Sequence, residues 1–264
     1  MKKVFLIGAA CLTLAACGGG GGTTVTTPKF APVQAHQGDG PGELELNAAG
    51  DRIKVDMGDV TTTLTAGSIA SAGTFVGGRQ TGSEQATAFV SATGNSRAGV
   101  AFTRNGTDPQ HLSSQFARLT QTDAPTTGSA TLTGDYVGIL TNNNNAIGRM
   151  TGDARITANF GNDTVRGRIT NREYGSLTTG NVFATVSVDD IVLEQTGFNG
   201  NGRFSGDISG GAFSTAAITG TSNGGNFAGL IAGVTGDEIV GGLQVNSTYG
   251  GQQFVEQGAF AAGH

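Results

Sequence analysis

Ala130-Thr131-Leu132-Thr133-Gly134-Asp135-Tyr136 is the stretch of sequence that decides the fold. Apolar or small residues stand at every second position, and threonine and aspartate fill the positions between them. This is the period of a β-strand with one buried face, because successive side chains on a strand point to opposite sides. The stretch therefore predicts a strand whose Tyr136 side faces a core and whose Asp135 side faces solvent.

The same alternation recurs to the end of the chain, with Gly, Asn and Asp turns between the segments. It is found at 153–160, 165–170, 204–209, 227–234, 239–245 and 254–261. About eight or nine strands at hairpin spacing predict an antiparallel up-and-down meander over residues 128–264, and closing it into a β-barrel removes its exposed edges. Glycines on the inward side predict a crowded interior filled by Phe, Ile and Leu: Gly134, Gly138, Gly167 and Gly206.

A smaller β-rich domain is predicted over residues 43–120. Short runs of β-forming residues, such as 85–92 and 98–103, are separated by turn residues. Leu112 to Leu119 is expected to form one short helical turn. The segment 121–128 contains Pro125 and no large apolar residue, so it is the predicted boundary.

The N-terminus has the pattern of a bacterial lipoprotein signal. Lys2 and Lys3 precede an apolar run, and Leu14-Ala15-Ala16-Cys17 ends it. We therefore expect residues 1–16 to be removed and Cys17 to be acylated, so that buried acyl chains hold the protein on a membrane. The alternative is an ordinary secreted protein cut after small residues, with Cys17 incidental. Residues 17–42, rich in Gly, Thr and Pro, are predicted to be a flexible stalk.

Composition limits the classes of fold and partner. The chain has 264 residues, 46 of them Gly, with no Trp and only 13% charged residues, a mixture that disfavours long helices. Removing Lys2 and Lys3 with the leader takes the formal charge from −5 to −7, so nucleic acid is not an expected partner. Cys11 leaves with the leader, so no disulfide or cysteine metal site is expected. The expected all-β fold is soluble and lipid-anchored, because arginine and aspartate occupy outward positions that lipid would penalise.

Five of the eleven arginines fall within 24 residues: Arg149, Arg155, Arg166, Arg168 and Arg172. On neighbouring strands Arg155, Arg166 and Arg168 would face outward. Two interpretations stay open at this point. The arginines either pair across strands with Asp153, Asp163 and Glu173, or form a patch that docks an acidic partner. Three scattered histidines and no nucleophile motif predict neither an enzyme nor a cofactor or metal site.

The C-terminal residues resemble the barrel domain of transferrin-binding protein B and related surface lipoproteins, which include factor H binding protein and haemophilin-like haem carriers. The matching pieces begin at Ala130-Thr131-Leu132-Thr133-Gly134-Asp135-Tyr136 and Ala158-Asn159-Phe160-Gly161-Asn162-Asp163. They continue through Phe204-Ser205-Gly206, Phe227-Ala228-Gly229, Glu238-Ile239-Val240-Gly241-Gly242 and Gly258-Ala259-Phe260.

That resemblance implies an eight-stranded barrel behind a handle-like domain at residues 43–120. It also implies a binding protein, without enzymatic activity, that captures a host or nutrient partner such as an iron carrier, haem or another protein. The alternative is a structural or assembly lipoprotein without a soluble ligand. Gly18 follows the cysteine where inner-membrane retention uses aspartate, so we expect the outer membrane, on its surface or its periplasmic face.

Overall fold

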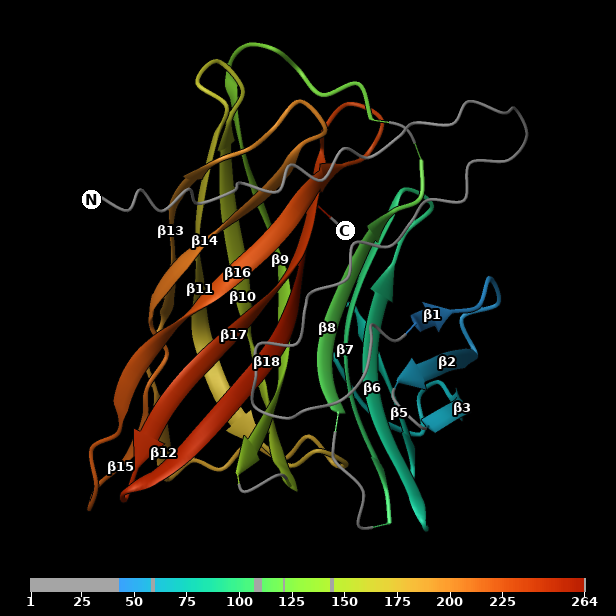
Figure 1. Ribbon diagram of the computed structural model, residues 1–264, viewed down its shortest axis with the longest axis vertical. Coiled ribbons are helices and arrows are strands. Elements are labelled where there is room, and N and C mark those ends of the chain that lie inside the picture. The colour runs from blue at the N-terminus through green and yellow to red at the C-terminus, as the bar shows by residue number, and fades with distance from the viewer. Residues whose placement is uncertain (1–42, 58–59, 107–110, 121, 143–144, 264) are drawn as a thin grey trace, which may run out of the picture.

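The computed structural model describes residues 43–57, 60–106, 111–120, 122–142 and 145–263. In this part of the chain the regular structure consists of strands and turns (Figure 1). No helix of the described residues is long and apolar enough to cross a membrane. The predicted leader, Cys17 and the stalk of residues 17–42 lie outside the described residues.

The C-terminal part is a closed barrel of eight antiparallel strands, which confirms the predicted fold class. Seven neighbouring pairs follow chain order, and pairing of the last strand with the first closes the barrel. The strands are β9 (Ser129–Asn142), β10 (Asn145–Asn159), β11 (Thr164–Gly175), β13 (Ile191–Gly197), β14 (Arg203–Gly210), β16 (Thr221–Ala232), β17 (Glu238–Tyr249) and β18 (Gln252–Ala262).

The barrel interior is filled by side chains, as the alternating pattern predicts. Large residues on the inward faces include Phe204, Phe227 and Phe260, packed with isoleucines and leucines. Glycine makes room for them: a Cβ on Gly167 would lie 3.1 Å from a Leu193 methyl carbon, closer than ordinary contact. One end is covered by a two-stranded ribbon of β12 (Val186–Val188) and β15 (Phe213–Thr215), and the Phe213 ring lies 4.9 Å from that of Phe254.

Residues N-terminal to the barrel form two sheets stacked beside it (Figure 1). The outer sheet contains β1 (Glu43–Leu46), β2 (Arg52–Met57) and β3 (Val60–Thr65). The middle sheet contains β4 (Ile69–Ala72), β5 (Phe75–Gln80), β6 (Glu84–Ala92), β7 (Ser96–Asn105) and β8 (His111–Arg118). Because it lies between the outer sheet and the barrel, both of its faces are buried, and β6 and β7 are almost continuously buried in consequence.

The helical turn expected at Leu112 to Leu119 is wrong, because β8 occupies that segment. It pairs with β7 along its whole length. Phe116 packs into the apolar core shared with the barrel, and the Gln115 side-chain oxygen accepts a hydrogen bond from the Leu44 backbone N–H at 2.8 Å. Tertiary contacts on both sides thus override the local sequence preference. The division into domains at residues 121–128 stays a prediction.

Apolar and polar contacts together join the middle sheet to the barrel. The apolar part includes Phe89, Val100 and Phe102 of the sheet against Val137, Ile139, Val240 and Ala259 of the barrel. At one edge, the buried carboxylate of Glu238 accepts hydrogen bonds from Ser96 at 2.6 Å and from Thr93 and Asn95 at 2.9 Å. These contacts fix the β6–β7 turn to the start of β17.

Arginines cross the same interface in both directions. Arg149 of the barrel donates to the carbonyl oxygens of Ala70 at 2.6 Å and Ser71 at 3.1 Å. Arg118 of the sheet donates through Nε to the Ile231 carbonyl at 3.0 Å, and through Nη2 to the Asn201 carbonyl at 2.7 Å. Burial lowers the pKa of Arg149, and of Arg118, where the charge of Arg203 adds to the effect. The cost of this burial is offset by the charge-assisted hydrogen bonds to these carbonyls.

Candidate functional site

Arg155, Arg166 and Arg168 lie together on the outer face of the barrel, and we call them the arginine surface. Arg155 is on β10 and the other two are on β11. Arg155 is the direct cross-strand partner of Arg168, and Thr157, two residues further along β10, is the partner of Arg166. All three side chains are exposed. The structure thus brings together the three residues that the sequence selected.

The acidic partners expected for these arginines are not beside them. Asp153 accepts a hydrogen bond from the Asn171 side chain at 2.6 Å, Glu173 lies opposite Thr151, and Asp163 is in the turn after β10. Among the described residues, the arginine surface makes one ion pair, Arg168 to Asp190 at 3.8 Å, with both side chains about half exposed. A pair this exposed contributes little to stability. The expected pairing with Asp153, Asp163 and Glu173 is therefore wrong in this structure.

The like charges of Arg155 and Arg168 face each other directly across the two strands. Such pairs are unfavourable on a sheet, because the side chains are held at short distance. Exposed guanidinium groups of this kind can bind carboxylates by paired hydrogen bonds.

Arg172 does not lie on the outer face with these arginines, because a β-bulge changes the direction of its side chain. The register of β10 and β11 shifts between Thr151 and Asp153, where Asn171 has a φ of 50°. The extra residue reverses the alternation, so Arg172 turns into the barrel although its separation from Arg168 predicts the outer face. The Asn171 side chain holds the bulge through its bond to Asp153.

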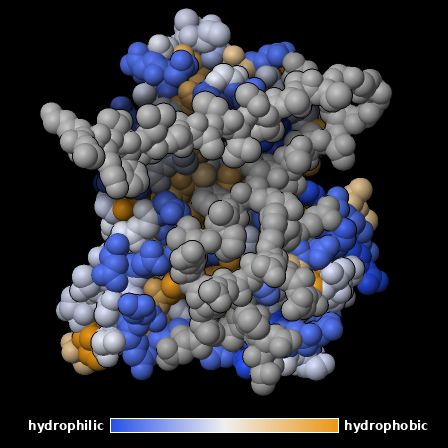
Figure 2. All heavy atoms as spheres, viewed as in Figure 1, coloured by the Kyte–Doolittle hydropathy of each residue, from blue (hydrophilic) through white to orange (hydrophobic). Residues whose placement is uncertain are grey.

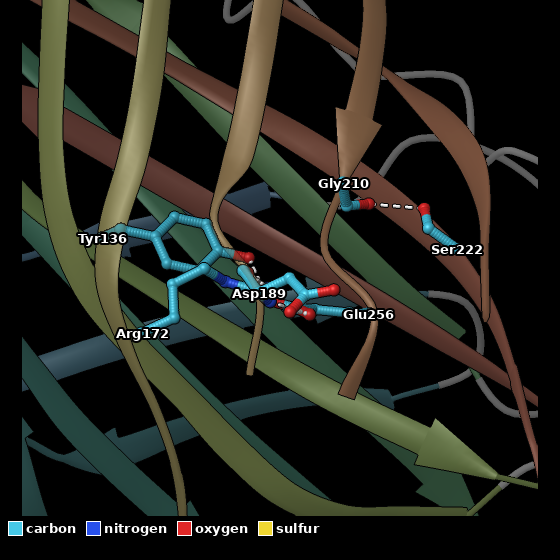
Figure 3. Close-up of polar contacts among 6 residues, drawn as sticks. All are labelled: Tyr136, Arg172, Asp189, Gly210, Ser222 and Glu256. Carbon is cyan, nitrogen blue, oxygen red and sulfur yellow. Dashed lines mark hydrogen bonds and ion pairs between the residues drawn. The ribbon is translucent and has the colours of Figure 1, made fainter. Parts of the chain in front are cut away.

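Inside the barrel, Arg172 forms a buried cluster with Glu256 and Tyr136, shown in Figure 3. Arg172 Nη2 donates to Glu256 Oε2, and Arg172 Nη1 donates to the Asp189 carbonyl at 2.6 Å. The Tyr136 hydroxyl donates to Glu256 Oε1 at 2.5 Å. Figure 3 also shows the Ser222 hydroxyl donating to the Gly210 carbonyl between β16 and β14.

This interior cluster was not predicted from the sequence. A signal was present, because Phe254, Glu256, Gly258 and Phe260 share one face of β18, so a carboxylate stands in an otherwise apolar row. Burial, and then the negative charge of Glu256, raise the pKa of Tyr136 well above its usual value. The phenol is therefore kept neutral and donates to the carboxylate.

The large apolar side chains that are exposed among the described residues are Leu119, Ile147, Val182, Phe183, Ile218 and Val234. Figure 2 shows a face on which the coloured residues are mainly hydrophilic, with small hydrophobic spots. One group lies where β10 begins and β11 ends: Ile147 and Phe183 are about 40% exposed, and the Phe183 ring lies 5.1 Å from that of Tyr174. Tyr174 donates to the Ile147 carbonyl at 3.2 Å.

Comparison with known proteins finds likeness in solved structures only. No protein-family model and no curated protein matches the chain. A transferrin-binding protein B double mutant from Haemophilus parasuis is 14% identical with a TM-score of 0.43, over 83% of this chain and 41% of that one. The isotype 1 transferrin-binding protein B from serogroup B Neisseria meningitidis is 13% identical with a TM-score of 0.40, over 84% of this chain and 51% of that one. Intact Ap-TbpB, with its N and C lobes, is 15% identical with a TM-score of 0.39, over 83% of this chain and 43% of that one.

The chain thus spans about half the length of these structures or less. At this identity and TM-score the likeness assigns no residue and no partner to the arginine surface. The candidate site therefore depends on the geometry of the chain itself.

Tyr136 should make stability sensitive to alkaline pH. Its folded pKa is raised above the unfolded value of about 10, so its contribution is fully present below pH 10 and is lost as pH rises through the folded pKa. We expect the free energy of unfolding to fall by up to about 1.4 kcal/mol per pH unit above pH 10. Tyr136→Phe should flatten this decline, as measured by urea unfolding at each pH.

Tyr174→Phe is the matched control for that measurement. Partial burial also raises the pKa of Tyr174, which has no carboxylate partner among the described residues, so its removal should flatten the decline less. An equal decline in wild type and Tyr136→Phe would contradict the buried neutral phenol.

Arg155→Glu should stabilise the barrel. It replaces a like-charge pair with Arg168 by an opposite-charge pair, for a gain of about 0.5 kcal/mol in the free energy of unfolding at low salt. Arg155→Thr removes only the repulsion and should fall between wild type and Arg155→Glu. Both gains should shrink in 0.5 M salt. Loss of stability in both variants would show that Arg155 is held by favourable contacts instead.

Proposed function

We propose that this chain is a lipid-anchored binding protein of the bacterial outer membrane, and that its arginine surface docks an acidic protein partner. The observation that supports it is the exposed group of Arg155, Arg166 and Arg168, in which one member has an acidic neighbour among the described residues. The proposal assigns binding, without catalysis, to the protein.

The position of the arginine surface suits a large partner. The middle sheet packs mainly against β9, β16, β17 and β18, and it contacts the start of β10 through Asn145 and Arg149. The arginine surface lies further along β10 and on β11. The guanidinium groups lie on the convex side of a barrel, where a macromolecular surface can reach all of them. Exposed charges of this kind chiefly raise the association rate of an oppositely charged partner.

The anchor is proposed from Cys17 and the leader before it. Acylation would hold the body at a membrane, and the stalk of residues 17–42 would give it reach. Gly18 favours the outer membrane over retention in the inner one. We propose further that the partner is a host or nutrient protein such as an iron carrier. Haem, the other ligand class implied by the family resemblance, is tested beside it.

Cys17→Ala should abolish acylation. Cells fed a clickable fatty acid should label the wild-type chain and leave the variant unlabelled, and the variant should move from the membrane fraction to the soluble envelope fraction. Cys11→Ala is the control, because Cys11 lies within the predicted leader, and it should label like wild type. Labelling of Cys17→Ala, or release of wild type without label, would refute the anchor.

Replacing the arginine surface should weaken partner capture. Immobilised mature chain is probed with host serum, with a purified iron-carrying protein and with haem, at 50 and 300 mM salt. We expect one protein to be captured in a salt-sensitive manner, and its association rate to fall about tenfold or more in the triple variant R155S/R166S/R168S. Arg52→Ser combined with Arg203→Ser is the control, since both arginines are exposed elsewhere.

Outcomes of this experiment separate the two classes of function. Capture that is equal in the triple variant and wild type would refute the arginine surface as the docking site. Failure of acylated wild type to capture any probe, on intact cells or when immobilised, would favour the structural or assembly lipoprotein. Circular dichroism and the unfolding midpoint of each variant show that the fold is retained.

A further inference from the structure

A small polar pocket opens where the interface between the middle sheet and the barrel ends. Its volume is about 50 Å³, and its walls come from β5, β6 and β7 of the sheet and from the start of β10. Arg79, Gln85, Thr87, Arg104 and Asn145 supply its polar side chains, and Phe102 and Leu177 its apolar ones. The pocket lies on residues outside the arginine surface.

The register of the sheet brings the two arginines to this pocket from opposite sides of β6. Arg79 of β5 is the partner of Thr87, and Arg104 of β7 is the partner of Gln85. Strands two apart are separated by roughly 10 Å, a gap that two arginine side chains pointing to the same side can span.

These arginines stand at the end of rows that are otherwise apolar. On β7, Val100 and Phe102 pack in the core shared with the barrel, and Arg104 is next on the same face. On β5, Phe75 occupies that core, and Arg79 follows at the same parity. Two half-buried arginines thus lie at the same end of one interface, at positions that continue apolar rows. An unpaired charge is unfavourable there, because it is partly removed from water.

The pocket is lined by positive charge and by hydrogen-bond donors. Arg104 is positioned by two hydrogen bonds, from Nε to the Gly106 carbonyl at 2.9 Å and from Nη1 to the Asn145 side-chain oxygen at 3.0 Å. Neither bond uses its Nη2. Within the described residues, neither Arg79 nor Arg104 has a carboxylate in salt-bridge distance, and none lines the pocket.

We propose that this pocket binds an oxyanion, the phosphate or carboxylate group of a small ligand. Guanidinium groups bind such oxygens by paired, charge-assisted hydrogen bonds, which lysine cannot reproduce. The volume exceeds the roughly 30 Å³ that one water occupies in the liquid, so a compact anionic group can enter the pocket. Because Asn145 belongs to the barrel and Arg79 to the middle sheet, the bound anion would touch both.

Isothermal titration calorimetry on the full mature chain tests this site, with sodium phosphate and sodium acetate as probes and sodium chloride at equal ionic strength as the reference. We expect one saturable site with a dissociation constant of about 0.1 to 1 mM for at least one oxyanion. Arg79→Gln and Arg104→Gln should each weaken it about tenfold or more. Arg52→Gln, on the outer sheet, should leave it unchanged.

The two probes distinguish the ligand chemistry. Saturation by phosphate alone indicates a tetrahedral anion, and saturation by acetate also indicates a carboxylate; either result supports the site. Heats that do not saturate with either probe, or binding that is equal in wild type and Arg79→Gln, would overturn it. Arg79→Gln keeps the test valid if loss of the Arg104 to Asn145 bond disturbs the fold, because the Arg79 guanidinium makes no hydrogen bond to the described residues.

Discussion

Pairing of β18 with β9 is the interaction on which the rest of the structure depends. It runs over nine residue partners, from Phe254 opposite Asn142 to Ala262 opposite Gly134, and it turns an open meander into a barrel. The same two strands carry part of the barrel's contact with the middle sheet on their outer faces, together with β16 and β17. Opening this seam would expose the interior and the interface together, so the two cores are coupled.

Period-two alternation predicted the strands of the barrel, and it does not show which strands are buried on both faces. β17 is buried along nearly its whole length, because Leu243 points into the barrel and Val240 packs against the middle sheet. The expected helical turn at 112–119 fails for the same reason: apolar residues there serve a contact with chain that lies far away in sequence. A local pattern records which side chains avoid water, and it does not record which partner covers them.

Three of the five clustered arginines were predicted to face outward and do so, and the positions of the other two depend on features outside the local pattern. Arg172 depends on a single backbone irregularity at Asn171, where the change of direction comes from one φ angle that composition does not reveal. Arg149 depends on a second sheet, whose Ala70 and Ser71 carbonyls accept its hydrogen bonds. Neither determinant is visible in the spacing of the arginines.

Arginine rather than lysine supplies the positive charge of this body, in which Lys54 is the one lysine among 43–264. Where an arginine is buried, its planar fork satisfies several acceptors at once, as Arg118 does with two carbonyls and Arg172 with a carboxylate and a carbonyl. At those positions the charge has a structural use. The arginine surface and the pocket of Arg79 and Arg104 are different. Within the described residues the arginine surface makes one exposed ion pair, and no carboxylate lies within salt-bridge distance of Arg79 or Arg104. Like charges held close together on a sheet are unfavourable, and we propose that an anionic acceptor from another molecule binds at both places.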